Sequence, residues 1–291
     1  MLILTKPCLP PAYPTKQPQL VVPAMSCDSH THIFDSFIKY PLSANRSFTP
    51  PEAPVEKLRE MLNVIGVERA VIVHSSAYGT DTSATLAAVK TDPKRLRGVA
   101  VTGPYTPISE IKELDKHGFS GSRLSTVVRG TPGFESLEAI ADNIKPFGWH
   151  IAVHVNNSIE LTDLAPRLLK LDMTIVVDHI ARVRSAEGVN APGFITLLKM
   201  LETGRCWVKL SALHRCSLQD YPCMDMKPFI DQLLEVAPHR VVWGTDWPHV
   251  NQFDKMQNDG DILDALNEWV PNEDLKNRIL VDNPAVLYRF G

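Results

Sequence analysis

The 291-residue chain lacks the cysteine spacing of a disulfide framework or a thiolate metal site. Its five cysteines are odd in number and scattered, and no Cys-x-x-Cys pair occurs. This usage is typical of free thiols in a reducing compartment. The sequence therefore excludes a disulfide-stapled class of protein, and any metal site needs other ligands.

Long apolar runs and a strong net charge are also missing. No run approaches the roughly 20 apolar residues of a membrane-spanning helix. The opening Met-Leu-Ile-Leu is too short for a secretory signal before Lys6 and a series of prolines. A net charge of −3 gives no overall field for nucleic acid or an anionic membrane. We expect a soluble cytoplasmic protein that binds neither, in which an anionic substrate meets local cations.

The sequence does contain a regular alternation of two segment types from residue 25 onward. Eight short apolar segments predict strands, near residues 25–34, 69–74, 97–101, 119–124, 149–155, 173–179, 206–210 and 240–244. Segments with apolar residues at helical spacing predict helices, near residues 55–65, 82–90, 108–114, 137–144, 161–171, 194–201, 229–236, 262–269 and from 275 onward.

Buried strands that alternate with amphipathic helices imply an α/β fold with a parallel sheet. Eight such units in about 250 residues match a (β/α)8 TIM barrel. The alternative is an open doubly wound sheet, but no Gly-x-Gly-x-x-Gly or phosphate-loop pattern follows a strand. Residues 1–24, with six prolines, predict an extended N-terminal segment, and residues 25–291 a single catalytic barrel.

Polar residues gather where the predicted strands end, which is where a barrel of this type carries its active site. His30 and His32 lie two residues apart on the first strand, so both imidazoles face the same side. His154 ends the fifth strand, His179 the sixth, and Asp246 follows the eighth. Such a set can bind one divalent ion and leave a position for water. Without a metal, the carboxylate could deprotonate water while imidazoles stabilise an oxyanion. The residues alone leave both mechanisms open.

Several motifs resemble the amidohydrolase superfamily, and within it the 2-pyrone-4,6-dicarboxylate lactonases and related lactone hydrolases. The resemblance runs from about Asp28 to Tyr288. Its motifs are His30-x-His32, Ser76-Ala-Tyr-Gly-Thr-Asp81, Gly-Ser-Arg123 with Arg129 six residues on, Gly148-Trp-His150, Asp178-His179-Ile-Ala-Arg182, Trp-Gly-Thr-Asp246-Trp-Pro-His249 and Asn283-Pro-Ala-Val-Leu-Tyr288.

The resemblance implies hydrolytic ring opening of a carboxylated lactone of the pyrone dicarboxylate, muconolactone or sugar-acid type. Asp246 would be the general base, and His30, His32 and His179 would hold the oxyanion. The residues implied to contact the anionic substrate are Arg123, Arg129, Arg215, Ser76, His154 and Phe48, with Arg182 as a further candidate. The alternative is a decarboxylase or lactone isomerase on the same barrel, and a homo-oligomer stays open.

Two positions depart from the pyrone lactonases, which work without metal. His154 and Phe48 stand where that family has tyrosines, and the two lost hydroxyls indicate a different lactone acid. With His154, the set of His30, His32 and Asp246 matches the mononuclear metal pattern of other superfamily members. The cofactor would then be one zinc or manganese ion, and metal-independent catalysis stays equally open.

Overall fold

The computed structural model describes residues 5–291, in which eight parallel strands follow one another in chain order. The strands are β1 Cys27–Thr31, β2 Arg69–Val73, β3 Leu96–Ala100, β4 Phe119–Ser125, β5 His150–His154, β6 Ile175–Val177, β7 Cys206–Leu210 and β8 Val241–Trp243. Each strand pairs with the next in parallel register. The prediction of a (β/α)8 barrel is confirmed, and the open doubly wound alternative is wrong.

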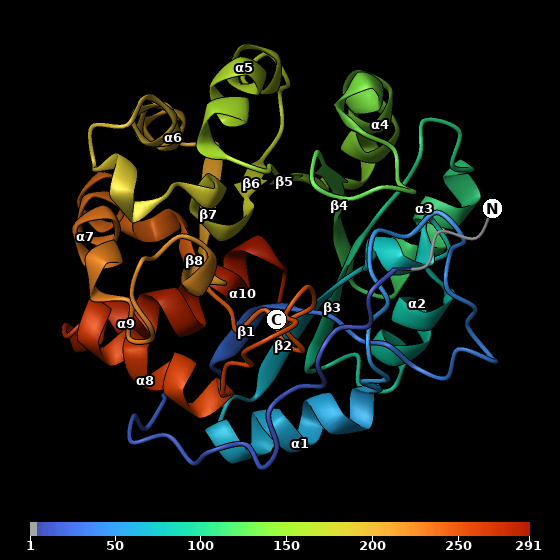
Figure 1. Ribbon diagram of the computed structural model, residues 1–291. Helices are drawn as coiled ribbons and strands as arrows, with labels where there is room; N and C mark the ends of the chain where they lie inside the picture. The colour runs from blue at the N-terminus through green and yellow to red at the C-terminus, as the bar shows by residue number, and fades with distance from the viewer. Residues whose placement is uncertain (1–4) are drawn as a thin grey trace.

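Helices surround the strands on the outside of the barrel (Figure 1). They are α1 Val55–Ile65, α2 Ser83–Lys90, α3 Ile108–Lys116, α4 Leu137–Ile144, α5 Ser158–Leu168, α6 Pro192–Glu202, α7 Lys227–Val236, α8 Asp259–Trp269, α9 Glu273–Asn277 and α10 Asn283–Leu287. Within residues 5–291, none of the helices has the length and apolar character that a membrane crossing requires.

Helix α1 shows how the sequence pattern produces these elements. Its apolar residues recur every three or four positions, so one face of the helix is buried against the barrel. Gly66 then ends the helix in the left-handed conformation, with φ 76°, and its N–H donates to the carbonyl of Leu62. The same apolar face and glycine stop that are visible in the sequence therefore place α1 between two strands.

The barrel closes where β1 meets the segment directly after β8. The N–H of His32 donates to the carbonyl of Trp247 at 2.7 Å, and the N–H of Asp246 donates to the carbonyl of His30 at 2.9 Å. Asp28 strengthens this seam, because its carboxylate accepts hydrogen bonds from the N–H and the hydroxyl of Thr245. The closure of the fold thus brings the first histidine pair and the last aspartate together.

The barrel interior is apolar at its amino-terminal end. Valines from several strands pack there against Leu287, Tyr288 and Phe290 of the chain end. The guanidinium groups of Arg69 and Arg97, at the starts of β2 and β3, lie over the Phe290 ring. Since this end is filled, a functional site can open only at the opposite, carboxyl end of the strands.

The proline-rich N-terminal segment packs on the barrel over its described part, residues 5–24. Backbone N–H groups of Gln19 and Leu20 donate to Asp264 of α8, and that of Lys16 donates to Asn258. No helix or strand forms within residues 5–24, as predicted from the prolines. Residues 1–4 of the predicted segment lie outside the described residues, and its status as a separate unit stays a prediction.

Candidate active site

Three histidines converge on the carboxylate of Asp246 at the carboxyl end of the barrel. The Nε2 atoms of His30 and His32 each lie 3.6 Å from Asp246 Oδ1, and that of His179 lies 3.9 Å away. All four side chains are buried. They come from β1 and the residue directly after it, from the segment after β6 and from the segment after β8, so residues far apart in the sequence form one cluster.

Unusual backbone conformations accompany these side chains. Asp246 has φ 70°, and each residue of the run 179–182 has a φ between 49° and 53°. Left-handed conformations are costly for residues other than glycine, and they cluster where surrounding structure over-determines the chain. Here they turn the chain sharply after β6 and β8. His179 Nε2 and Asp246 Oδ1 then lie 3.9 Å apart.

The ring orientations are fixed by partners on neighbouring strands. His32 Nδ1 lies 2.7 Å from the carbonyl oxygen of Val73, which can only accept, so Nδ1 carries the ring proton. In the neutral form of this ring, the lone pair lies on His32 Nε2 and faces the carboxylate of Asp246. His179 Nδ1 contacts the Ser211 hydroxyl at 2.7 Å. His32 Nε2 and Asp246 Oδ1 are then two hydrogen-bond acceptors 3.6 Å apart. A hydrogen-bond donor or a cation between them would satisfy both.

Burial and charge set the ionisation of this cluster. Burial by itself raises the pKa of Asp246, but His179, His32 and Arg215 outweigh it and hold that pKa well below its usual range. Burial lowers the pKa of His179 well below its ordinary value. Burial, assisted by Lys209, lowers the pKa of His30 to about 3. The cluster at neutral pH thus holds one carboxylate, with neutral rings at His30 and His179.

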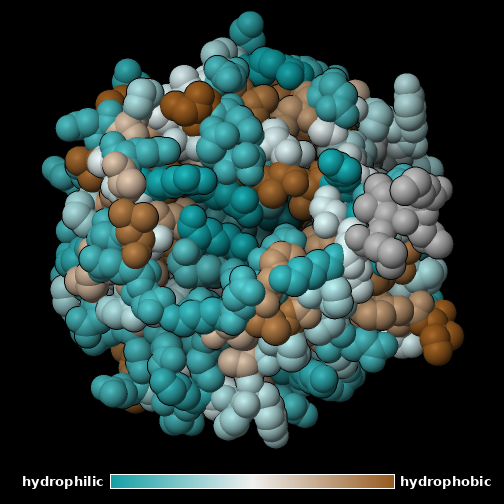
Figure 2. All heavy atoms as spheres, in the orientation of Figure 1, coloured by the Kyte–Doolittle hydropathy of each residue, from teal (hydrophilic) through white to brown (hydrophobic). Residues whose placement is uncertain are grey.

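A small cavity of about 30 Å³ opens beside the cluster, near the hollow that Figure 2 shows among hydrophilic side chains. Such a volume accommodates about one water molecule. The predicted site residues that line the cavity are His32, Phe48, Ser76, Arg123, His154, His179, Arg215 and Asp246. Arg182, the further candidate, also lines it, together with Ser75, Val128, Val250 and Asn251.

Two predicted site residues lie elsewhere. Arg129 is exposed and is absent from the cavity lining, because the loop after β4 carries it to the β1–α1 loop, where its N–H donates to Ser47. His30 is fully buried and does not line the cavity either. Its Nε2 nevertheless lies 3.6 Å from Asp246 Oδ1. The structure therefore does not place Arg129 where the resemblance implies.

Three guanidinium groups border the cavity. Arg123 Nε donates to Asp178 at 2.7 Å, and Arg215 Nη2 donates to the carbonyl of Val250 at 2.5 Å. Arg182 Nε is buried without a hydrogen-bond partner among the described residues. A buried, unpaired cationic donor is costly unless a ligand satisfies it. The three groups together suit an anionic substrate.

Lys209 was not predicted from the sequence to belong to the site, and Asp178 was given no role of its own. Lys209 is fully buried in the barrel, with Nζ 3.1 Å from His30 Nδ1 and 3.2 Å from Asp178 Oδ1. A lysine inside the otherwise apolar segment Cys-Trp-Val-Lys-Leu was the signal that could have revealed it. Asp178 then links Lys209 with Arg123.

The donor set fits a divalent ion in part. His30, His32 and Asp246 offer ligand atoms within 4.8 Å of one another, as do His30, Asp178 and His179. His30 Nε2 is buried and has no hydrogen-bond partner within residues 5–291, which agrees with a ligand role. His154 belongs to neither group, so the described residues do not assemble the predicted four-residue set. Instead, His154 Nδ1 contacts the Ser125 hydroxyl at 2.9 Å, and its ring packs against His179.

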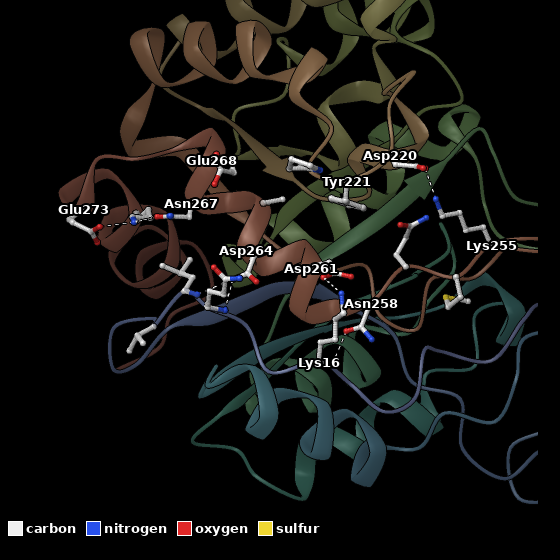
Figure 3. A pocket seen from close by; sticks show the side chains of 18 residues that line it. Lys16, Asp220, Tyr221, Lys255, Asn258, Asp261, Asp264, Asn267, Glu268 and Glu273 are labelled. Atoms are coloured by element: carbon white, nitrogen blue, oxygen red, sulfur yellow. Dashed lines mark hydrogen bonds and ion pairs between the residues drawn. The ribbon is translucent and has the colours of Figure 1, made fainter.

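A larger cavity of about 960 Å³ lies between the N-terminal segment and α8 (Figure 3). Charged side chains dominate it, but Lys16 pairs there with Asp261, and Lys255 with Asp220. None of the converging histidines lines this cavity. Size alone therefore does not mark the reactive site, and the small cavity beside Asp246 is the candidate.

The chain belongs to the amidohydrolase family, whose model matches residues 27–290. It is 36% identical over 288 residues to a 4-sulfomuconolactone hydrolase of Hydrogenophaga intermedia, covering 97% of this chain and 94% of that one. It is 34% identical over 289 residues to a 2-pyrone-4,6-dicarboxylate hydrolase of Comamonas testosteroni, covering 95% and 94%. A D-galactarolactone isomerase of Agrobacterium fabrum is 26% identical over 278 residues, covering 94% of each.

A solved structure agrees with this assignment. The chain resembles a probable 2-pyrone-4,6-dicarboxylic acid hydrolase from Acinetobacter baumannii, crystallised with citric acid, at 25% identity and a TM-score of 0.82. The match covers 91% of this chain and all of the other. The prediction of membership in the amidohydrolase superfamily is confirmed.

Proposed function

We propose that this protein is a lactone hydrolase that opens the ring of a small lactone acid with water. The observation that carries the proposal is the ionised Asp246 carboxylate, 3.6 to 3.9 Å from three imidazole Nε2 atoms at a cavity bordered by guanidinium groups. The two hydrolase relatives act on lactones by name, which supports the same reaction class here.

The chain's own residues suggest how water is activated. Asp246 Oδ1 and the lone pair of His32 Nε2 can accept the two hydrogens of one water, which bridges the 3.6 Å between them. The water oxygen then presents a lone pair to the lactone carbonyl. As the new C–O bond forms, Asp246 takes the proton and afterwards returns it to the leaving alkoxide.

His179 provides the donor for the developing negative charge. Its Nδ1 contacts Ser211, which orients the ring so that Nε2 faces the cavity region beside Asp246. An N–H at that position can hydrogen-bond the carbonyl oxygen as it becomes an oxyanion. Arg123, Arg182 and Arg215 would hold the substrate acid, and Phe48 would pack on its apolar face.

A divalent ion held by His30, His32 and Asp246 would lower the pKa of a bound water towards neutrality. The protein groups that orient the substrate and receive its charge stay the same in that case. Zinc or manganese suits such a nitrogen and oxygen donor set.

The second candidate is a lactone isomerase, favoured by the similarity to D-galactarolactone isomerase. In that reaction, a hydroxyl of the substrate would take the place of water beside Asp246. The products distinguish the two, because hydrolysis adds one water to the mass, isomerisation leaves the mass unchanged, and the decarboxylase alternative releases carbon dioxide.

The test is a panel of muconolactone, pyrone dicarboxylate and sugar-acid lactones, followed by proton release and mass spectrometry. We expect Asp246→Asn to lower kcat by about 10² to 10⁴-fold, because the proton acceptor is lost. Substrate affinity should stay near the wild-type value, because the guanidinium groups are intact. Asp261→Asn, which removes a surface carboxylate paired with Lys16, is the control. Near-normal kcat in Asp246→Asn would exclude this mechanism.

A further inference from the structure

Lys209 is a buried charged residue that contacts the candidate site and has no role in the proposed reaction. Its side chain is fully buried on β7 and does not line the cavity. Nζ lies 3.1 Å from His30 Nδ1 and 3.2 Å from Asp178 Oδ1. Burying an ammonium is costly even when it is paired. Its contact with His30, a residue of the candidate site, points to a role there.

We propose that Lys209 is a positioning residue that fixes the ring proton of His30 on Nε2, directed at Asp246. An ammonium group donates hydrogen bonds and has no lone pair to accept one. His30 Nδ1 must then be the acceptor of the 3.1 Å contact. A neutral imidazole has a single ring proton, which leaves it on Nε2, 3.6 Å from Asp246 Oδ1.

The competing arrangement involves Asp178. Its Oδ1 lies 3.4 Å from His30 Nδ1 without an accepted hydrogen bond, whereas Oδ2 accepts from Arg123 at 2.7 Å. If His30 Nδ1 carried the ring proton and donated it in a hydrogen bond to Asp178 Oδ1, Nε2 would hold the lone pair. That state is the one a divalent ion requires, since metal-binding histidines commonly donate their other N–H to a carboxylate. Lys209 opposes it by occupying Nδ1.

Two consequences follow for the site. Lys209, His30 and Asp246 form a chain of contacts from β7 through β1 to the segment after β8, which orients the carboxylate from below. The same chain disfavours His30 as a metal ligand and favours the metal-independent form of the reaction. The orienting effect on turnover rests on the proposed hydrolase function, but the position of the ring proton does not.

The first test reads that proton directly, in the full-length protein without any lactone. Long-range proton–nitrogen spectra of protein labelled with ¹⁵N-histidine distinguish the two neutral tautomers, and His30→Gln identifies the His30 signals. We expect Nε2 to be protonated in the wild type and the proton to move to Nδ1 in Lys209→Met. A wild-type ring with the proton on Nδ1, or no change in Lys209→Met, would overturn the proposal.

The second test measures zinc affinity by equilibrium dialysis, which does not depend on turnover. Lys209→Met should bind zinc about 10- to 100-fold more tightly than the wild type, the range typical of changes to groups behind a metal ligand. Lys276→Met is the matched control, because Lys276 is a buried lysine on α9, paired with Asn267 and Glu273 away from the site. Equal zinc affinity in Lys209→Met and the wild type would contradict the inference.

Two further controls separate an effect of Lys209 on folding from its effect on function. Lys209→Gln keeps an N–H donor for His30 and should retain the wild-type tautomer, and the wild-type spectrum decides the question even where Lys209→Met fails to fold. With a chelator present, Lys209→Met should lower kcat more than it raises KM. If no lactone is turned over, the hydrolase proposal fails while the tautomer result stands.

Discussion

At the scale of single residues, the candidate site is preorganised by contacts between strands. The His32 ring is held by the carbonyl of Val73 on β2, and the His179 ring by Ser211 after β7. Each reactive ring is thus oriented by a partner that comes from another part of the sequence. Such support fixes the position of each ring, and at His32 it also places a proton on Nδ1, because a carbonyl can only accept.

Arg182 is the most informative residue for substrate binding, because its Nε is buried without a partner among the described residues. We expect Arg182→Gln to raise KM for a lactone acid about 10- to 100-fold, since a hydrogen bond to a charged group contributes roughly 1.5–3 kcal/mol. Steady-state kinetics on the lactone identified by the panel measure this. Arg167→Gln, which removes a pair with Glu138 on the outer surface, is the control and should leave KM unchanged. An unchanged KM in Arg182→Gln would remove this residue from the substrate site.

At the scale of elements, helix α8 connects the N-terminal segment with the barrel. The side chain of Asn258 caps the helix by accepting from the N–H of Gly260 and also accepts from the N–H of Lys16. One residue therefore satisfies both the start of the helix and the segment that lies along it. This explains how a proline-rich stretch without its own secondary structure becomes attached to the fold.

Loss of this double contact should have two separable effects. Asn258→Ala removes the cap, so we expect a loss of about 1 kcal/mol in the free energy of unfolding, measured by urea denaturation. It should also speed proteolytic cleavage near Lys16. Asn272→Ala, which removes only the cap of α9, should leave that cleavage unchanged. Equal cleavage rates in the two variants would argue against the attachment role of Asn258.

At the scale of the whole molecule, the barrel buries several histidines in their neutral form. Burial is the main cause that lowers the pKa of each, with values of about 3 for His30, His150 and His214 and about 4 for His74. Burial likewise lowers the pKa of His154 and of His179 well below the ordinary histidine value. The unfolded chain therefore binds more protons than the folded chain at pH values below about 6.5, the ordinary histidine value.

Stability should accordingly fall as the pH drops from 7 to 5. Each such histidine removes about 1.4 kcal/mol for every pH unit below 6.5, until its folded pKa is reached. Asp28 and His249 act in the opposite direction. Burial raises the pKa of Asp28 to about 7, and contact with Asp259 outweighs burial and raises the pKa of His249, but the histidines with a lowered pKa outnumber these two groups. Urea midpoints at pH 7, 6 and 5 measure the effect, and His74→Gln should weaken the dependence. A midpoint that rises towards pH 5 would contradict this account.

The sequence by itself determined the fold class and the centre of the site. Apolar strands alternating with amphipathic helices are local patterns, so the eight-stranded barrel could be predicted without knowledge of any contact. Parallel strands present their carboxyl ends at one end of a barrel, which brought His30, His32, His154, His179 and Asp246 together in the prediction. In the structure, the Nε2 atoms of His30, His32 and His179 each lie within 3.9 Å of Asp246 Oδ1.

Only the tertiary structure decided what surrounds that centre. The contact of Lys209 with His30 joins positions 179 residues apart, and no local pattern encodes it. The packing of His154 against His179 and the outward path of the loop that carries Arg129 depend on register and loop course. A strand pattern states which side chains reach the barrel end. Which atoms meet there is set by non-local packing, because neighbouring strands and loops fix each side chain's position together.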